Sequence, residues 1–128
     1  MEYDDEVAHS AVQTLYQLGR GEDERPWCLT VSFTHPHDPY VARRPHLDLH
    51  ADCDDLNPHV TALDFADQDP HSQRLFLAND YRNFDISDED IRRSRRAYLA
   101  NISYLEDKIG ALMTALAAMC MDENTIIL

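Results

Sequence analysis

Residues 87–119 read SDEDIRRSRRAYLANISYLEDKIGALMTALAAM, and this stretch carries the strongest structural signal in the chain. Ser87 and Asp90 resemble a capping box, and the acidic residues 88–90 favour a helix N-terminus. Apolar residues then recur mostly at alternating spacings of four and three, which is typical of one stripe on an α-helix. Its members are Ile91, Tyr98, Ile102, Leu105, Ile109, Leu112, Leu116 and Met119. The pattern predicts a helix over residues 88–119, and Gly110 indicates close approach to a neighbouring element.

A short apolar run stands on each side of this helix in the sequence. Residues 27–33, WCLTVSF, are rich in apolar and β-branched residues, as in a strand buried on both faces of a parallel sheet. Residues 125–128, TIIL, read as the start of a second buried strand. A strand, a crossover and a second strand imply a parallel pair with a right-handed connection. The predicted fold class is therefore α/β.

The remaining segments complete the predicted order of helix, strand, long loop, long helix and strand. Residues 5–19 have helical periodicity, with Asp4 or Asp5 as N-cap and Gly19 as a left-handed C-terminal cap. Residues 36–87 contain five prolines and read as a loop insertion. Parallel sheets need cover on both faces, which two helices and two strands do not provide. We therefore expect residues 1–128 to be an incomplete internal segment of a larger α/β domain.

Composition excludes several classes of protein. The 128 residues are 44% hydrophobic, which is enough for a core. The sequence contains no run of 18 apolar residues, the length needed to cross a membrane. The formal net charge of −13 would repel nucleic-acid phosphates. Three widely spaced cysteines and an acidic N-terminus without an apolar core argue against a secreted disulfide scaffold. We expect a cytoplasmic protein with neither a nucleic-acid nor a membrane partner.

Two histidines follow the first predicted strand, where residues 31–40 read VSFTHPHDPY. Ligands of open α/β sheets bind at the carboxyl ends of strands, so His35 and His37 are candidates for chemistry. An imidazole can donate to an anionic oxygen, protonate a leaving group or bind a metal. A polar turn whose histidines bond loop carbonyls explains the spacing equally well. His46 and His50 have the spacing of the two histidines in the zinc-protease motif, but the glutamate that this motif needs directly after the first histidine is absent. We therefore predict a surface turn there.

Several motifs together resemble the sulfatase family of the alkaline phosphatase superfamily. They are SFTHPHDPY, QDPHSQR, NDY, RRSRRAYLANISYLEDKIGALMTAL and DENTIIL, and they span nearly the whole chain. HPHDPY and residues 69–74 and 79–81 point to the branch that acts on choline O-sulfate. The resemblance implies a segment of an alkaline-phosphatase-like sulfatase domain, part of a sulfuric ester hydrolase that releases choline and sulfate. A sulfatase or phosphoesterase for another ester, and a non-catalytic truncated module, remain alternatives.

The resemblance also implies roles for the two histidines. His37 lies between Pro36 and Pro39 and matches the histidine of the family's Pro-His-x-Pro motif, which contacts the sulfate and the leaving oxygen. His37 is therefore the expected catalytic residue. His35 is expected to bind substrate or to orient His37.

The family's cofactors are expected outside this chain. Family members use a formylglycine nucleophile made within a C-x-P-x-R-type motif, and neither Cys28, Cys53 nor Cys120 fits that motif. They also bind a divalent cation, usually calcium, and no metal ligand is expected among these residues. We expect the isolated chain to bind neither group and to be inactive. The full-length enzyme is expected to be a homo-oligomer that acts on a small-molecule sulfate ester.

Overall fold

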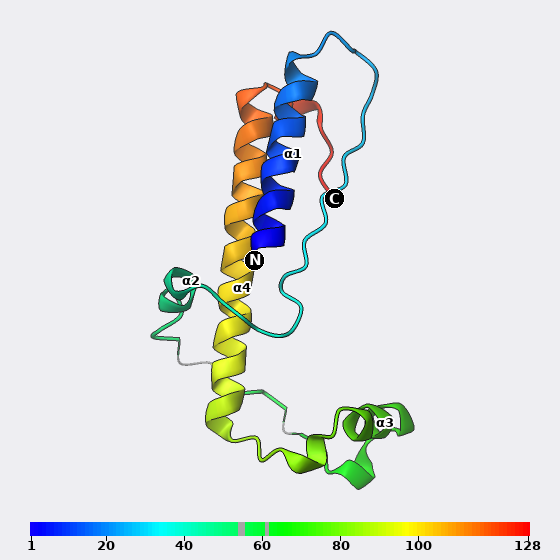
Figure 1. Cartoon of the computed structure of the whole chain (residues 1–128), viewed down its shortest axis with the longest axis vertical. Coiled ribbons are helices and arrows are strands. Elements are labelled where there is room, and N and C mark those ends of the chain that lie inside the picture. The colour runs from blue at the N-terminus through cyan, green and yellow to red at the C-terminus, as the bar shows by residue number, and fades with distance from the viewer. Residues whose placement is uncertain (54–55, 61) are drawn as a thin grey trace.

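Two parallel helices organise the chain, whose computed structural model describes residues 1–53, 56–60 and 62–128. Helix α1 (Glu2–Arg20) lies along the C-terminal half of helix α4 (Asp88–Ala118), and both run in the same direction (Figure 1). Leu15 of α1 packs with Ala115 and Leu116 of α4 to form the buried core. Leu29 and Met121 pack against this cluster from outside the helices.

The predicted long helix is confirmed, and it starts at the predicted residue. The Ser87 hydroxyl accepts from the Asp90 backbone N–H at 3.2 Å, and the Asp90 carboxylate accepts from the Ser87 N–H at 3.1 Å. This capping box satisfies donors that the helix itself leaves free. Helix α4 then runs to Ala118, one residue short of the predicted end.

The first helix is longer than predicted and is capped differently. Helix α1 begins at Glu2, so Asp4 and Asp5 lie within its first turn and neither is the N-cap. Its C-cap is Gly21, which has an extended backbone, and not a left-handed Gly19. Gly19 lies inside the helix, where an added Cβ would stand 2.7 Å from the Cβ of Met119. Close approach between the helices therefore occurs at Gly19, whereas a Cβ at Gly110 would meet nothing within 4 Å.

The buried face of α4 is not the predicted apolar stripe. Ile102 and Ile109 are 40% and 51% exposed. Only Leu116 belongs both to the predicted stripe and to the residues of α4 that are buried. At 100° per residue, the centres of these two faces differ by about a quarter of a turn around the helix. Along α1 the buried face presents Ala115, which packs with Leu15, and its small side chain lets the two helices approach closely. The buried residues are Ala97, Ala100, Asn101, Tyr104, Ala115 and Leu116.

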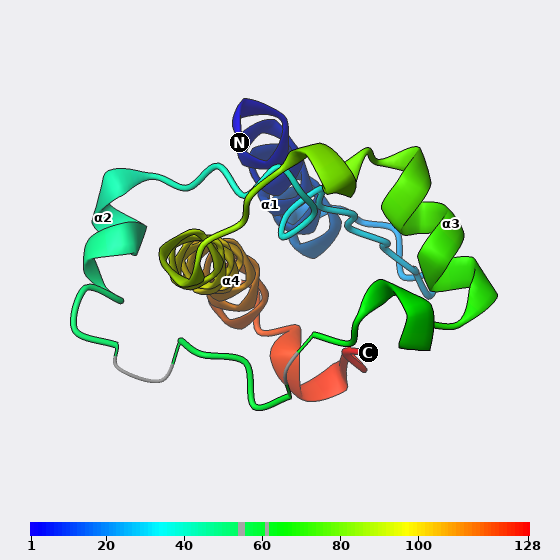
Figure 2. The same cartoon turned by 90° about the horizontal axis from the view of Figure 1, so that it is seen from below.

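The predicted α/β fold class is wrong, because the described part of the chain contains helices and no β-strand. Residues 27–33 run beside α1 (Figures 1 and 2), with Leu29, Val31 and Phe33 partly buried and Thr30 and Ser32 exposed. A strand needs ladder hydrogen bonds to a neighbouring strand, and an apolar run does not supply that partner. The alternation also shows that one side of this segment is covered and not both.

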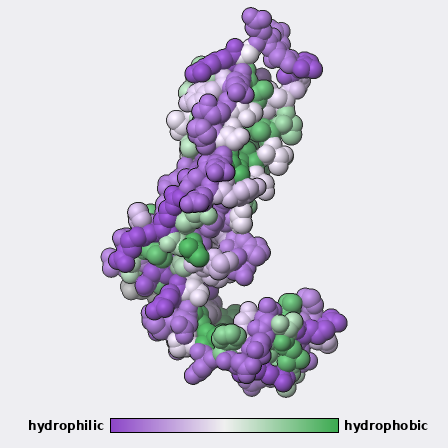
Figure 3. Space-filling model, viewed as in Figure 1, coloured by the Kyte–Doolittle hydropathy of each residue, from purple (hydrophilic) through white to green (hydrophobic). Residues whose placement is uncertain are grey.

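The C-terminal segment likewise forms no strand. Residues 125–128 have no regular secondary structure, and Ile126, Ile127 and Leu128 are exposed. Figure 3 shows apolar surface along the side of the helical pair where the chain's C-terminal end lies. Among the described residues, no helix is long and apolar enough to cross a membrane.

The predicted loop 36–87 contains short helices in its described part. Helix α2 (Arg44–Asp48) packs on α4, and helix α3 (Pro70–Ala78) lies apart near the N-terminal end of α4 (Figures 1 and 2). The 3-10 turns η1 (Phe65–Asp67) and η2 (Tyr81–Asn83) flank α3, and a third, η3 (Asp122–Asn124), follows α4. The Phe76 ring contacts Phe65 and Tyr81 at centroid distances of 5.4 and 5.7 Å. This aromatic group joins α3 to both neighbouring turns.

The two helical glycines provide a matched test of the helix packing. Gly19→Ala should lower the free energy of unfolding by about 1–3 kcal/mol, because the new methyl group overpacks the contact with Met119. Gly110→Ala should raise it by about 0.5–1 kcal/mol, since the site is open and alanine favours helix. Urea unfolding of both variants measures the difference. Equal stabilisation by the two substitutions would contradict the packing of α1 on α4.

Candidate functional site

The turn at residues 34–39 sends its two histidines into different environments. The His37 backbone N–H donates to the Thr34 carbonyl at 3.1 Å, which closes the start of the turn. The His35 side chain is only 9% exposed, whereas the His37 side chain is 75% exposed. The structure therefore does not bring the two imidazoles together as a pair.

His37 is oriented by the residue that follows it. Its Nδ1 lies 2.8 Å from the Asp38 carbonyl oxygen and 2.9 Å from Asp38 Oδ1. Both partners are acceptors when the carboxyl is ionised, so Nδ1 carries a proton. Nε2 is then the nitrogen that remains for a ligand, as a donor in the charged ring and as an acceptor in the neutral ring.

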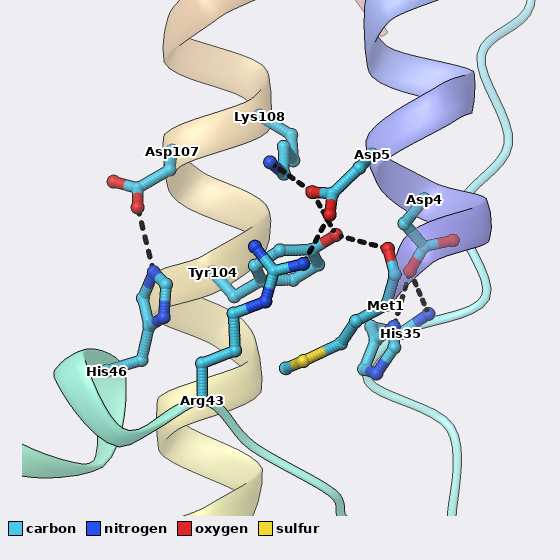
Figure 4. Close-up of polar contacts among 9 residues, drawn as sticks. All are labelled: Met1, Asp4, Asp5, His35, Arg43, His46, Tyr104, Asp107 and Lys108. Atoms are coloured by element: carbon cyan, nitrogen blue, oxygen red, sulfur yellow. Dashed lines mark hydrogen bonds and ion pairs between the residues drawn. The ribbon is translucent and has the colours of Figure 1, made fainter.

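His35 is held by a buried carboxylate of α1. Its Nδ1 makes a short contact with Asp4, whose side chain is fully buried (Figure 4). The Asp4 carboxylate also accepts from the backbone N–H groups of Thr34 at 2.8 Å and His35 at 3.1 Å. Burial by itself would raise the pKa of Asp4, but the hydrogen bonds from Thr34 and His35 outweigh it, and the pKa lies below its usual value.

Tyr104 of α4 is fully buried and lies at the centre of a polar cluster (Figure 4). Its hydroxyl oxygen lies 2.9 Å from both the Met1 carbonyl oxygen and Asp5 Oδ1, so it donates toward these acceptors. The His35 and His46 rings contact the Tyr104 ring edge-on, at centroid distances of 5.4 and 5.6 Å. Burial and the neighbouring Asp5 carboxylate raise the pKa of Tyr104, so it remains a neutral donor.

Two cations complete the cluster around Asp5. Lys108 Nζ lies 2.6 Å from Asp5 Oδ1, and the Arg43 guanidinium makes a short ion pair with Asp5 (Figure 4). Both cations also lie over the Tyr104 ring, at 4.8 Å for Lys108 and 5.3 Å for Arg43. The hydrogen bond from Lys108 is the main cause that holds the pKa of Asp5 well below its usual value.

His46 and His50 do not form the simple surface turn that the sequence predicted. They attach α2 and the turn after it to α4. His46 Nε2 lies 2.8 Å from Asp107 Oδ2, and His50 Nε2 lies 2.9 Å from the Ser103 hydroxyl. These contacts assign the two histidines a role in packing.

Sequence reasoning missed Asp4, Asp5, Tyr104 and Lys108 as members of one cluster. One signal was available, because Asp4 falls on the same helical stripe as Ala8, Ala11 and Leu15. An acidic residue on an apolar stripe indicates a buried charge that needs partners. Nothing local in the sequence indicated that the partners come from residues 34–35.

The described residues do not fit a metal site. Within residues 1–53, 56–60 and 62–128, no three histidine, cysteine or acidic side chains gather into a group that could hold a metal ion. Cys28, Cys53 and Cys120 are free thiols.

Comparison with known proteins confirms the resemblance to sulfatases. The chain is 60% identical over its whole length to a choline-sulfatase of Rhizobium meliloti (strain 1021), of which the match covers 26%. An arylsulfatase of Clostridium perfringens (strain 13 / Type A) is 28% identical over 87% of the chain and 22% of its own length. No family model matches the chain. The chain thus spans about a quarter of the length of the curated relatives it matches.

The lowered pKa of Asp5 predicts a specific acid sensitivity. Folding lowers the pKa of Asp5 from its unfolded value near 3.8. The ionised carboxylate therefore stabilises the fold above that value, and this contribution is lost as the pH falls toward the folded pKa. Asp5→Asn should cost about 1–2 kcal/mol at pH 7, allowing for partial exposure, and this cost should shrink below about pH 4. Urea unfolding of both proteins from pH 7 to pH 3 measures it.

Asp23 supplies the control for this experiment. It pairs with Arg25 on the exposed surface, so Asp23→Asn should change the free energy of unfolding little at any pH. A cost of Asp5→Asn that stays constant down to pH 3 would contradict the assigned role of the Asp5 charge.

Proposed function

We propose that the chain is part of a sulfuric ester hydrolase that cleaves choline O-sulfate to choline and sulfate. The observation that carries the proposal is the 60% identity to a choline-sulfatase along all 128 residues. The 28% identity to an arylsulfatase supports the broader reaction, hydrolysis of a sulfate ester, independently of the alcohol. The residue pattern HPHDPY, which pointed to the choline branch, lies within the first of these matches.

His37 is the residue of this chain that we assign to the chemistry. Cleavage of a sulfate ester builds negative charge on the leaving oxygen, and choline leaves as a poorly stabilised alkoxide. In a doubly protonated imidazole, Nδ1 donates to Asp38 and Nε2–H is available to that oxygen. Its exposure on the turn is consistent with a group that meets a ligand. Asp38 then orients the ring.

His35 fits a different task. Its ring is packed against Asp4 and the edge of Tyr104 and has little exposed surface. A substrate would have to displace these contacts to reach it. We therefore propose that His35 supports the turn that carries His37.

The resemblance assigns the nucleophile and a divalent cation to other parts of the full-length protein. Such groups would supply attack on sulfur and charge stabilisation when bound. The contribution of this chain is to hold His37 on a turn that is anchored to the α1–α4 pair. Its substrate is expected to be a small-molecule sulfate ester.

His37→Ala in the full-length protein tests the assigned role. A positioned general acid contributes about 10²–10⁴-fold, equivalent to about 3–5 kcal/mol of barrier, so kcat for choline O-sulfate should fall by that factor. The kcat for nitrophenyl sulfate should fall by a smaller factor, because its leaving group is already stable as an anion. Steady-state kinetics on both substrates measure the effect.

A second histidine variant separates general from specific effects. His9 is exposed on α1 and belongs to neither the turn nor the Tyr104 cluster, so His9→Ala should retain kcat on both esters. Near wild-type kcat on choline O-sulfate for His37→Ala would show that the acid has been assigned to the wrong residue. A wild-type protein that hydrolyses only aryl sulfates would favour the arylsulfatase alternative.

The isolated 128-residue chain should have no sulfatase activity. It lacks a fitting nucleophile motif, and its described residues hold no metal-binding group. The measurement is release of sulfate from choline O-sulfate and nitrophenyl sulfate, with calcium or magnesium added. Metal-dependent turnover above that of a His37→Ala control would show that the chain carries its own catalytic machinery.

A further inference from the structure

Asp4 connects the first turn of α1 to the turn that carries His37. Its carboxylate is fully buried and accepts from two consecutive backbone N–H groups, at Thr34 and His35, and from the His35 ring. A buried carboxylate is tolerated only when hydrogen bonds replace its lost hydration. Here all three donors come from residues 34 and 35, which lie 30 and 31 positions away in sequence.

The same two residues also determine where the backbone places His37. The Thr34 carbonyl accepts from the His37 backbone N–H at 3.1 Å, so the anchor on Asp4 continues directly into the turn. The His35 ring is packed edge-on against Tyr104, which places this end of the turn against α4. The His37 side chain has no comparable packing of its own, since it is 75% exposed. Its position is therefore set through the backbone.

We propose that Asp4 is a positioning residue for His37, whose carboxylate holds the start of the turn in the geometry that aims the imidazole at the leaving oxygen. The proposal rests on the proposed function, because it acts through the role of His37 in ester cleavage. A displacement of about 1 Å can cost 10²-fold in rate, so an anchor of this kind matters for catalysis.

Asp5 is a natural comparison, because it is the next residue of the same helix and its carboxylate belongs to the cluster around Tyr104. Its partners are Lys108, Arg43 and Tyr104, and none of them belongs to the turn. Both acidic residues stabilise the packing of α1, but only Asp4 contacts residues 34–35. Loss of Asp5 should therefore affect stability without a specific effect on His37.

The central experiment is Asp4→Asn in the full-length protein. Asparagine keeps the size of the side chain, but its NH₂ group cannot accept, so at least one of the donors at residues 34–35 loses its partner. We expect kcat for choline O-sulfate to fall by about 10- to 100-fold, with KM little changed. Nitrophenyl sulfate, which depends less on a leaving-group acid, should lose a smaller factor in kcat. Asp5→Asn should leave the ratio of the two kcat values unchanged.

Combination with His37→Ala decides whether Asp4 acts through the histidine. If it does, Asp4→Asn should add little to the loss already caused by His37→Ala on choline O-sulfate. Losses that multiply in the double variant, or that are equal for the two substrates, would overturn the proposal and leave Asp4 a purely structural residue. Circular dichroism should show that each variant is folded.

A second variant covers the case in which Asp4→Asn does not fold. His35→Ala removes the ring from the anchor while both backbone N–H groups still reach Asp4. This variant should lower kcat by a smaller factor than Asp4→Asn does. The fall should again be larger for choline O-sulfate than for nitrophenyl sulfate. An equal loss on both esters would again overturn the proposal. Wild-type protein that hydrolyses no sulfate ester would instead refute the proposed function, so the two failures are distinguishable.

Discussion

The buried phenol of Tyr104 is the contact on which the arrangement of the chain depends. A tyrosine this deep in a protein must give its hydroxyl a partner, and here the partners are the Met1 carbonyl and Asp5. Those two bonds tie the start of α1 to the middle of α4. Around the ring, His35 brings in the turn at 34–39 and His46 brings in α2. One side chain thus joins segments that are distant in sequence.

Charge is concentrated at this point in a chain that is otherwise strongly acidic. Lys108, the single lysine of the sequence, pairs with Asp5 together with Arg43. Asp4, one residue earlier, has no such cation and is instead satisfied by backbone N–H groups and an imidazole. Adjacent acidic residues therefore do different work. Asp5 neutralises the charges of the nearby Lys108 and Arg43. Asp4 instead fixes the backbone that leads to His37.

Much of the helical structure could be predicted because its causes are local. The capping box of Ser87 and Asp90 and the apolar repeat after it lie within a few residues of each other, and they placed α4 within one residue at its C-terminal end. The choice of buried face was not local. The buried alanines and Tyr104 of α4 are less hydrophobic than Ile102 and Ile109, which remain exposed. Periodicity detects a stripe, but close packing selects the face that lets two helices approach.

The sequence by itself determined the two main helices, the turn that carries His35 and His37, and the resemblance to sulfatases. These depend on neighbouring residues, or on the identity of motifs that can be read along the chain. Only the tertiary structure decided that residues 27–33 form no strand, because a strand is made by its hydrogen-bonded partner. Only the tertiary structure also separated the two histidines, by burying His35 against Asp4 and leaving His37 exposed. That contact spans about a quarter of the chain, and no local propensity encodes it.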